Sequence, residues 1–332
     1  MKLLKIALTG GPCAGKTAAL SRIKEAFTKM DYKVFIINET ATELRLSGIT
    51  PQELGIYDYQ SKQFYLQCTK EDVCGQEALS SGADKVLIVC DRGLPDNAAY
   101  LTPNEYYFIL KEQNMTRLET FERYDAVFML RSVSNISEKI YDENSNPIRT
   151  ENAVKAHALD ERILLAWAEH PNLYVLDATD NFEEKMNKLL LSIAGFCGDE
   201  KPFLFNEKYI ISLPDFNKID VKTRSERETY KIGNDSYAIK ETTGEETGYK
   251  LVENNIGYYC NHQDFLHAIG NNEDAYKKKI TSTVYGFSYK NEYIEITTIP
   301  HLDKTAVMRV DKRSKEETTD IPDFITVIDK FA

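Results

Sequence analysis

The stretch "GGPCAGKT", residues 10–17, has the residue types and spacing that can hold a chain of phosphates. Gly10 and Gly15 allow backbone conformations and close approaches that a Cβ would obstruct. Successive N–H groups of such a loop point into one concavity at a helix N-terminus, where the helix dipole favours an anion. Lys16 is expected to reach the β- and γ-phosphates, and Thr17 to offer its hydroxyl to Mg²⁺. The predicted nucleotide-binding residues are therefore Gly10, Gly11, Pro12, Cys13, Ala14, Gly15, Lys16 and Thr17.

The residues on either side of this loop predict a strand before it and a helix after it. The run "LLKIALT" is apolar, and "AGKTAALSRIKEAFTKM" repeats its apolar residues at helical spacing. The G-x-x-x-x-G-K-[ST] pattern requires this strand–loop–helix context. The context disfavours the alternative of an ordinary glycine-rich turn.

Two acidic residues follow predicted strands and could complete a catalytic site. "FIINE" ends in Glu39, and "VLIVCD" ends in Asp91, directly before Arg92. A carboxylate placed like Asp91 can hold Mg²⁺, directly or through water. The alternatives are that Glu39 only begins a helix and that Asp91 is only an N-cap. Asp96, in "LPDNAAY", is likewise either a site residue or an N-cap.

Two arginines are candidates for stabilising the transferring phosphate. The polar stretch "YDENSNPIRTEN" carries Arg149 between a predicted strand and a predicted helix. A loop of this kind with one arginine is the usual form of a lid over a phosphoryl-transfer site, and a solvated loop with a surface arginine is the alternative. Arg131, just past the fourth strand, is the second candidate. The predicted catalytic residues are Lys16, Glu39, Asp91 and Arg149.

The first half of the chain alternates strands and helices. Five apolar runs predict strands, and helices are expected at about 57–79 and in "ENAVKAHALDERILLAWAEH". The runs are "LLKIALT", "KVFIINET", "KVLIVCDRG", "YDAVFMLRSV" and "LYVLDAT". This pattern predicts an α/β domain with a parallel sheet covered on both faces, and ligands bind outside the carboxyl ends of such strands.

From about Lys201 the sequence instead predicts many short strands rich in Tyr, Thr, Ile and Val. They are expected in "EKYIISL", "KIDVKT", "ETYKI", "SYAIKETT", "GYKLVE", "ITSTVYGFSY", "EYIEITTI" and "KTAVMRVD", with one helix in "HQDFLHAIGN". Their spacing predicts an antiparallel sheet or barrel. The chain is therefore divided into a nucleotide-binding domain, residues 1–198, and a β-barrel-like α+β domain, residues 201–332.

Basic residues on these strands could converge on a polyanion inside a barrel. The expected ligand is a phosphorylated small molecule or a phospholipid headgroup, and the alternative is a sheet whose basic residues simply face water. The candidates are Lys208, Arg224, Arg227, Lys240, Lys250 and Arg309.

Composition limits the remaining function classes. The 332 residues carry a formal net charge of −11, which argues against general nucleic-acid binding. No apolar run reaches the length of a membrane helix, so stable membrane insertion is not expected. Six cysteines show no paired or zinc-binding spacing and predict reduced thiols in the cytoplasm. "NKID", residues 217–220, fits a guanine-reading pattern but lies beyond the first domain and is interpreted as a chance match.

Four stretches together resemble a known P-loop family. "GGPCAGKT", "NETATEL", "CDRGLPDNAAYL" and "NPIRTENAVKAHALDERILLAWAEH" are similar in order and spacing to the AAA-like ATPase domain shared by TRPL-translocation-defect proteins and ribosylnicotinamide kinases. The "RTE" and "LDERILLAW" stretches favour the former group. The resemblance implies that Glu39, Asp91 and Arg92 line the active site, that Arg92 contacts the nucleotide, and that Arg149 is the lid arginine.

The second half resembles a degenerate CYTH domain, the triphosphate-tunnel fold. Members of that family begin with E-x-E-x-K, whose glutamates bind metal. When Lys208 is aligned with that lysine, Leu204 and Asn206 stand at the glutamate positions. The resemblance therefore implies a binding module without triphosphatase activity.

Two functions fit these features. One is Mg²⁺-dependent binding and hydrolysis of a purine nucleoside triphosphate, ATP or GTP, coupled to binding of a phosphorylated ligand by the second domain. The other is a small-molecule or nucleoside kinase in which Glu39 or Asp91 activates the acceptor hydroxyl. The P-loop and Asp91 fit both, and the sequence does not choose between adenine and guanine.

Overall fold

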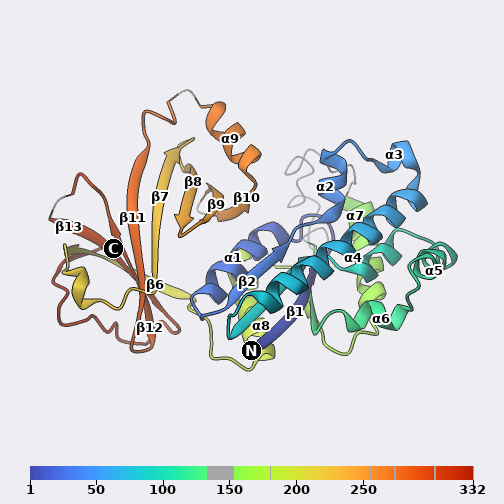
Figure 1. The fold of residues 1–332 in the computed structure, drawn as a ribbon, viewed down its shortest axis with the longest axis horizontal. Coiled ribbons are helices and arrows are strands. Elements are labelled where there is room, and N and C mark those ends of the chain that lie inside the picture. The colour runs from blue at the N-terminus through green and yellow to red at the C-terminus, as the bar shows by residue number, and fades with distance from the viewer. Residues whose placement is uncertain (133–152, 180, 255, 273, 303, 332) are drawn as a thin grey trace. The chain divides into compact units, whose positions relative to one another are not determined.

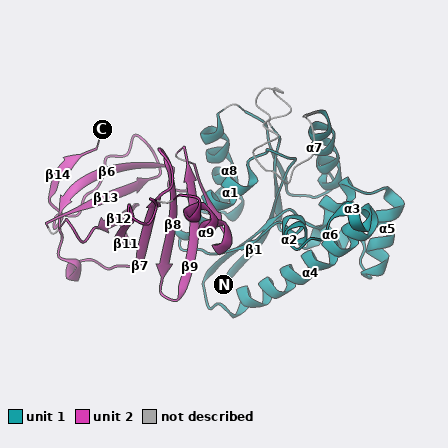
Figure 2. Cartoon of the chain, turned by 90° about the horizontal axis from the view of Figure 1, so that it is seen from above, with its two compact units in different colours: residues 1–200 teal, residues 201–332 magenta. Residues whose placement is uncertain are grey.

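The chain forms two compact units, Met1–Glu200 (unit 1) and Lys201–Ala332 (unit 2), shown in separate colours in Figure 2. The structure is a computed structural model. It describes residues 1–132, 153–179, 181–254, 256–272, 274–302 and 304–331. Within these ranges, no helix combines the length and the apolar character needed to cross a membrane.

Unit 1 is built on a five-stranded parallel sheet with the order β2-β3-β1-β4-β5. Its strands are β1 (Lys2–Thr9), β2 (Lys33–Ile37), β3 (Lys85–Asp91), β4 (Ala126–Leu130) and β5 (Leu173–Leu176). The second half of β1, nearly all of β3 and the whole of β4 are buried, as expected for central strands covered on both faces. The α/β parallel sheet predicted from the alternating pattern is confirmed.

Helices cover both faces of this sheet. They are α1 (Lys16–Thr28), α2 (Thr40–Leu46), α3 (Pro51–Leu54), α4 (Ile56–Ser80), the 3₁₀ helix η1 (Leu94–Ala99), α5 (Pro103–Glu112), α6 (Arg117–Glu122), α7 (Ala153–Trp167) and α8 (Phe182–Cys197). Helices α1 and α8 pack together, while the long α4 lies against β2 and β3 (Figure 1). One core cluster joins the sheet to α4 and α7 through residues that include Ala7, Ile88, Val127, Ala78 and Trp167.

Unit 2 is a nine-stranded antiparallel sheet with the order β10-β9-β8-β7-β11-β12-β13-β6-β14. Its strands are β6 (Phe205–Ser212), β7 (Thr223–Lys231), β8 (Ser236–Thr243), β9 (Glu246–Glu253), β10 (Ile256–Cys260), β11 (Ile280–Tyr289), β12 (Glu292–Thr298), β13 (Thr305–Lys312) and β14 (Val327–Lys330). Helix α9 (His262–Gly270) packs on β8 and β9. The predicted antiparallel sheet is thus confirmed, and in the described residues its ladder runs from one edge strand, β10, to the other, β14.

One predicted strand of unit 2 is wrong. "KIDVKT" forms no strand of its own; a short 3₁₀ helix, η4 (Phe216–Lys218), leads into an irregular segment before β7. The Asp215 side chain accepts a hydrogen bond from the Asn217 backbone N–H and so caps this turn. Ile219 packs in the core of unit 2, so its apolar side chain reflects burial of a loop and not strand pairing.

Candidate functional site

The carboxyl ends of three adjacent strands bring the phosphate loop and both acids together. Strand β3 pairs with β1 so that Asp91 lies opposite Leu8, and it pairs with β2 so that Cys90 lies opposite Ile37. The loop after β1, Asp91 at the end of β3 and Glu39 just after β2 therefore share one edge of the sheet. In parallel sheets this edge is where ligands bind.

The loop of residues 10–15 has the backbone geometry expected of a phosphate-binding loop. Gly10 has a φ of +139°, and a Cβ there would lie 2.1 Å from the Leu130 carbonyl oxygen. Gly15 has a φ of +90° and directly precedes α1, which begins at Lys16. The N–H groups of the first helical turn have no intrahelical acceptor and can bind an anion.

Two side chains from distant parts of the chain hold this loop. Asp160 of α7, which is fully buried, accepts a hydrogen bond from the Gly11 N–H at 2.8 Å. The Ser132 hydroxyl donates to the Pro12 carbonyl at 2.6 Å. Neither contact uses an N–H group of residues 13–17. These supporting residues have no local motif, so sequence reasoning missed them.

Lys185 of α8 is a third support, buried to 3% exposure. Its ammonium donates to the Ala14 carbonyl at 3.1 Å and to the Arg131 carbonyl at 2.7 Å. Burial lowers the pKa of Lys185 from 10.5 to about 8. In the sequence, Lys185 stands four residues before Leu189, in line with the apolar residues of the helix, and this position is the signal that could have found it.

Because of Lys185, we expect the free energy of unfolding of unit 1 to increase with pH between pH 8 and pH 10.5. In that window the unfolded chain binds the proton and the folded chain does not, so stability increases with pH, by up to about 3 kcal/mol. The Lys185→Met variant should lack this increase. Denaturant unfolding at pH 7.5, 9 and 10 measures the difference between the two proteins, and parallel pH profiles would contradict the assignment.

Lys16 is buried and folded back over the loop. Its ammonium donates to the Gly10 carbonyl at 2.9 Å and to the Gly11 carbonyl at 3.1 Å. Its charge also favours the ionised forms of Glu39 and Asp91. Lys16 therefore lies within electrostatic reach of both acids that the sequence predicted beside it.

Glu39 and Arg92 form an ion pair at this edge. The Arg92 Nε donates to the Glu39 carboxylate at 2.7 Å, and Arg92 has a positive φ of +69°. Burial alone would raise the pKa of Glu39, but the charges of Arg92 and Lys16 lower it to about 2. Glu39 precedes α2, but its carboxylate accepts no hydrogen bond from the backbone of that helix. The carboxylate pairs with Arg92 instead.

Asp91 is the acid with an unsatisfied oxygen. Its side chain is at the end of β3 and the residue is 8% exposed, yet its Oδ1 atom has no hydrogen-bond partner. Burial and the nearby charge of Glu39 raise the pKa of Asp91 to about 7. A buried unpaired carboxylate oxygen is costly for stability, which is typical of groups kept for function. It is not an N-cap, because η1 begins only at Leu94.

Asp96 is a fully paired buried residue. Its carboxylate accepts hydrogen bonds from the Thr9 hydroxyl at 2.5 Å, the Gly93 N–H at 2.9 Å and the Trp167 indole at 3.0 Å. It also pairs with Arg92 at 3.3 Å. Of the two alternatives for Asp96, the geometry favours the capping role at the start of η1.

The two arginine candidates have different outcomes. Arg149 lies outside the described residues. Arg131 follows β4, where its Nε donates to the Asp160 carboxylate at 2.6 Å and its guanidinium pairs with Glu161. Arg131 thus joins β4 to α7 and orients the acid that holds the loop.

Strand register in unit 2 separates the basic residues that were expected to converge. Directly paired residues share a sheet face, and neighbours along a strand alternate. By this rule Lys208, Arg227, Lys250 and Arg309 lie on one face, whereas Arg224 and Lys240 lie on the other. The prediction that all six converge is therefore wrong; four of them share a face of the sheet and two lie on the opposite face.

Acids accompany these basic side chains. Arg227 pairs with Glu241 at 2.9 Å, and the Arg309 Nε lies 2.7 Å from the Asp311 carboxylate. On the other face, Lys240 pairs with Glu228 at 3.5 Å. Lys208 is exposed, and Lys250 lies over the ring of Tyr259.

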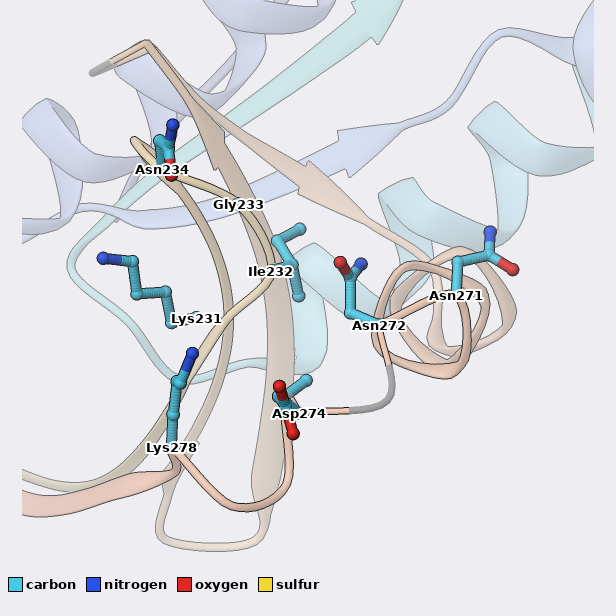
Figure 3. Close-up of a pocket in the computed structure, with 9 residues that line it drawn as sticks. Lys231, Ile232, Gly233, Asn234, Asn271, Asn272, Asp274 and Lys278 are labelled. Carbon is cyan, nitrogen blue, oxygen red and sulfur yellow. The ribbon is translucent and has the colours of Figure 1, made fainter.

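Unit 2 also contains a polar hollow with a volume of about 390 Å³. It lies between the turn that follows β7 and the segment that follows α9. In Figure 3 the side chains of Lys231 and Lys278 lie on one side of it, and those of Asn271 and Asn272 lie on the other. None of its lining residues belongs to the predicted sites.

The fold and the loop define unit 1 as a P-loop nucleotide-binding domain. A family model described as an AAA domain matches residues 5–185, which is more than half of the chain, and the protein belongs to this family. No curated protein matches the chain significantly.

Two solved structures of the protein NE1496, described once as a hypothetical protein and once as an inorganic triphosphatase, are similar to part of the chain. Both are 14% identical to it. They cover 38% and 37% of this chain and 87% and 83% of their own, with TM-scores of 0.27 and 0.26.

Proposed function

We propose that unit 1 binds ATP or GTP with Mg²⁺ and hydrolyses the γ-phosphate. The observation that carries this proposal is the meeting of Lys16, Glu39 and Asp91 at the carboxyl ends of three adjacent strands. A lysine and a helix N-terminus suit the phosphates, and a buried acid with a free oxygen suits a cation.

The residues present fit a magnesium ion. Thr17 is exposed in the first turn of α1, and Asp91 Oδ1 is without a protein partner. We assign the two residues to the metal, with Asp91 acting directly or through water. Bound there, Mg²⁺ would neutralise charge on the phosphate oxygens. Lys16 and the N–H groups of residues 13–17 would hold the same phosphates in position.

A kinase is the second candidate function. It is favoured by two adjacent carboxylates whose pKa values are pushed apart, to about 2 for Glu39 and about 7 for Asp91. Such a divergence is typical of acid–base sites, since a general base works best when its pKa lies near the operating pH. In this candidate the carboxylate of Glu39 or of Asp91 takes the proton of an acceptor hydroxyl.

The test of the proposed function is phosphate release by the purified full chain. ATP and GTP are supplied separately, with Mg²⁺ or with excess chelator. Release that requires Mg²⁺ and is lost in Lys16→Ala supports hydrolysis at this site. Absence of both nucleotide binding and release in the wild-type protein would refute the proposal.

For unit 2 we propose binding of a phosphorylated ligand by the shared face of Lys208, Arg227, Lys250 and Arg309, coupled to hydrolysis in unit 1. The register that puts the four on one face supports it. The acids Glu241 and Asp311 offset part of the charge of Arg227 and Arg309. The remaining positive charge of this face would attract a polyanion, and salt would screen this attraction.

We expect the double variant Lys208→Ala/Lys250→Ala to bind tripolyphosphate at least tenfold more weakly than the wild-type chain at 50 mM salt. Binding by the wild-type protein should also weaken as salt is raised to about 0.5 M. Arg224→Ala, on the opposite face, is the matched control and should bind normally. Calorimetry measures all three, and equal losses in the control and the double variant would reject this face as the site.

A further inference from the structure

Helix α4 carries a stripe of buried polar side chains on the face that looks toward the sheet. Gln60, Gln63, Gln67 and Glu71 are each at most 7% exposed. Their spacing of three and four residues puts them on one side of the helix. Burying several polar groups on a helix is costly unless each finds a partner.

The two halves of this stripe differ. Gln67 accepts a hydrogen bond from the Thr40 hydroxyl at 2.5 Å and donates to Glu71 at 2.9 Å. Glu71 in turn pairs with Arg123 at 2.9 Å. By contrast, the side-chain oxygens of Gln60 and Gln63 are buried without any partner. The polar side chains near the C-terminal end of the stripe thus have hydrogen-bond partners, whereas the oxygens of the two glutamines near its N-terminal end have none.

The unsatisfied end lies at the ligand edge of the sheet. Helix α4 ends at Ser80 and the chain enters β3 at Lys85, so α4 runs antiparallel to the strands. Gln67 meets Thr40, the residue after Glu39. Gln63 and Gln60 lie one and two turns further along, beyond the carboxyl ends of the strands, where ligands of such sheets bind.

A second segment brings another unpaired oxygen to this edge. Asn97 of η1 is 1% exposed, and its amide donates to the Leu94 carbonyl at 3.0 Å while its Oδ1 has no partner. Helix α4 packs against η1, with Phe64 and Leu94 in one apolar cluster. Because η1 starts three residues after Asp91, Asn97 and Asp91 belong to consecutive segments of the chain. The three amide side chains therefore come from two segments, α4 and η1, that pack together next to the end of β3.

We propose that Gln60, Gln63 and Asn97 form the binding site for the phosphoryl acceptor, and that this acceptor is a neutral small molecule rich in hydroxyl groups. Hydroxyl groups can donate to the three amide oxygens, which lack partners in the protein. An anionic group is disfavoured at these three positions, because an amide oxygen only accepts hydrogen bonds and a phosphate or carboxylate oxygen has no proton to donate to it. This inference rests on the kinase candidate above.

The reaction this site would serve is a single phosphoryl transfer. The acceptor oxygen forms a bond to the γ-phosphorus while the bond from that phosphorus to the β–γ bridging oxygen breaks. The nucleoside diphosphate leaves with that oxygen, and the hydroxyl proton passes to one of the two carboxylates at this edge, Glu39 or Asp91. The amide side chains take no part in the chemistry; they bind and orient the acceptor.

The test measures transfer of labelled phosphate from γ-labelled ATP or GTP to glycerol, D-ribose, myo-inositol and uridine by the full chain. The wild-type protein should phosphorylate at least one of the four. In Gln60→Met/Gln63→Met, the KM for that acceptor should rise at least tenfold, because Met keeps the shape and removes the hydrogen-bonding oxygen. The thermal midpoint should not fall, since no hydrogen bond to either oxygen is lost.

Two further variants complete the experiment. Gln76→Met changes the same residue type on an exposed part of α4 and should behave as wild type. Asn97→Leu probes the site from η1 and should also raise the acceptor KM, which keeps the test decisive if the double variant does not fold.

The possible outcomes separate the two proposals. Phosphate release to water without transfer to any of the four acceptors overturns the acceptor site and leaves hydrolysis standing. Transfer with an unchanged acceptor KM in the folded amide variants places the acceptor elsewhere and also overturns the inference. Failure of the wild-type chain to bind either nucleotide rejects the proposed function itself.

Discussion

Replacing Lys16 with alanine is expected to weaken binding of a nucleoside triphosphate about ten- to a hundredfold while unit 1 stays folded. A charge-assisted contact to the β- and γ-phosphates contributes roughly 1.5–3 kcal/mol, which corresponds to this loss. The Lys16 ammonium already lies over the loop, where it donates to the Gly10 and Gly11 carbonyls. Few of its rotamers remain to be lost on binding, so most of the contact energy favours the nucleotide.

Calorimetry with a non-hydrolysable triphosphate measures this effect. Lys62→Ala removes the same charge from an exposed position on α4 and is the matched control. The Lys16 variant should keep the far-ultraviolet circular dichroism of the wild type, since Asp160 and Lys185 still hold the loop. An affinity equal to that of the wild-type protein would mean that the loop does not bind phosphates.

The core of the site could be predicted from sequence because its signals are local. "GGPCAGKT" fixes its own backbone through Gly10 and Gly15, and each of Glu39 and Asp91 ends an apolar run. Parallel strands then bring such ends to one edge, whatever their order in the sheet. What the sequence could not supply is the order β2-β3-β1, which makes Asp91 the direct neighbour of the loop.

The supports of the site were missed because they are remote in the chain. Asp160 and Lys185 lie 149 and 171 residues from the loop residues they hold. In "LDERILLAW" the aspartate resembles any charged residue of an amphipathic helix. Gln60 and Gln63 were overlooked for a related reason: a glutamine in a helical pattern predicts an exposed face, and only the fold shows these two to be buried.

In unit 2 the positions of the strands in the sequence were easier to predict than their pairing and register. Alternating residues located most strands, but β10 and β14 are short, and all four residues of β14 are exposed, so neither has a strong apolar pattern. Which basic side chains share a face depends on register, since a shift by one residue moves a side chain to the opposite face. Arg224 and Lys240 were therefore grouped with residues that lie across the sheet from them.

Asp91→Asn is expected to reduce Mg²⁺-dependent turnover by about a hundred- to a thousandfold, with a smaller loss of nucleotide affinity. Whether Asp91 fixes the metal or takes a proton, its negative charge acts mainly where charge develops during transfer. Asparagine has the same shape and lacks that charge. Single-turnover kinetics measure the chemical step, and calorimetry measures nucleotide affinity separately.

The same substitution should leave unit 1 more stable above pH 7. Burial and the charge of Glu39 raise the pKa of Asp91 to about 7, above its ordinary value of 3.8. Between these values the folded chain binds the proton and the unfolded chain does not, so the stability contributed by Asp91 falls as pH rises through that window. An asparagine side chain does not ionise, so the variant should lose this dependence. Denaturant unfolding at pH 5 and pH 8 checks the sign.

A gain in stability together with a loss of turnover would identify Asp91 as a functional acid, since a structural acid should lose stability when it is changed. The Asp91 Oδ1 atom has no hydrogen bond to lose, whereas the carboxylate of Asp96, five residues later, has four partners. Asp96→Asn is therefore the comparison, and it should destabilise unit 1 at every pH. Unchanged turnover in Asp91→Asn would remove Asp91 from the chemistry. Glu39→Gln would then test the remaining acid, whose ion pair with Arg92 keeps it charged at neutral pH.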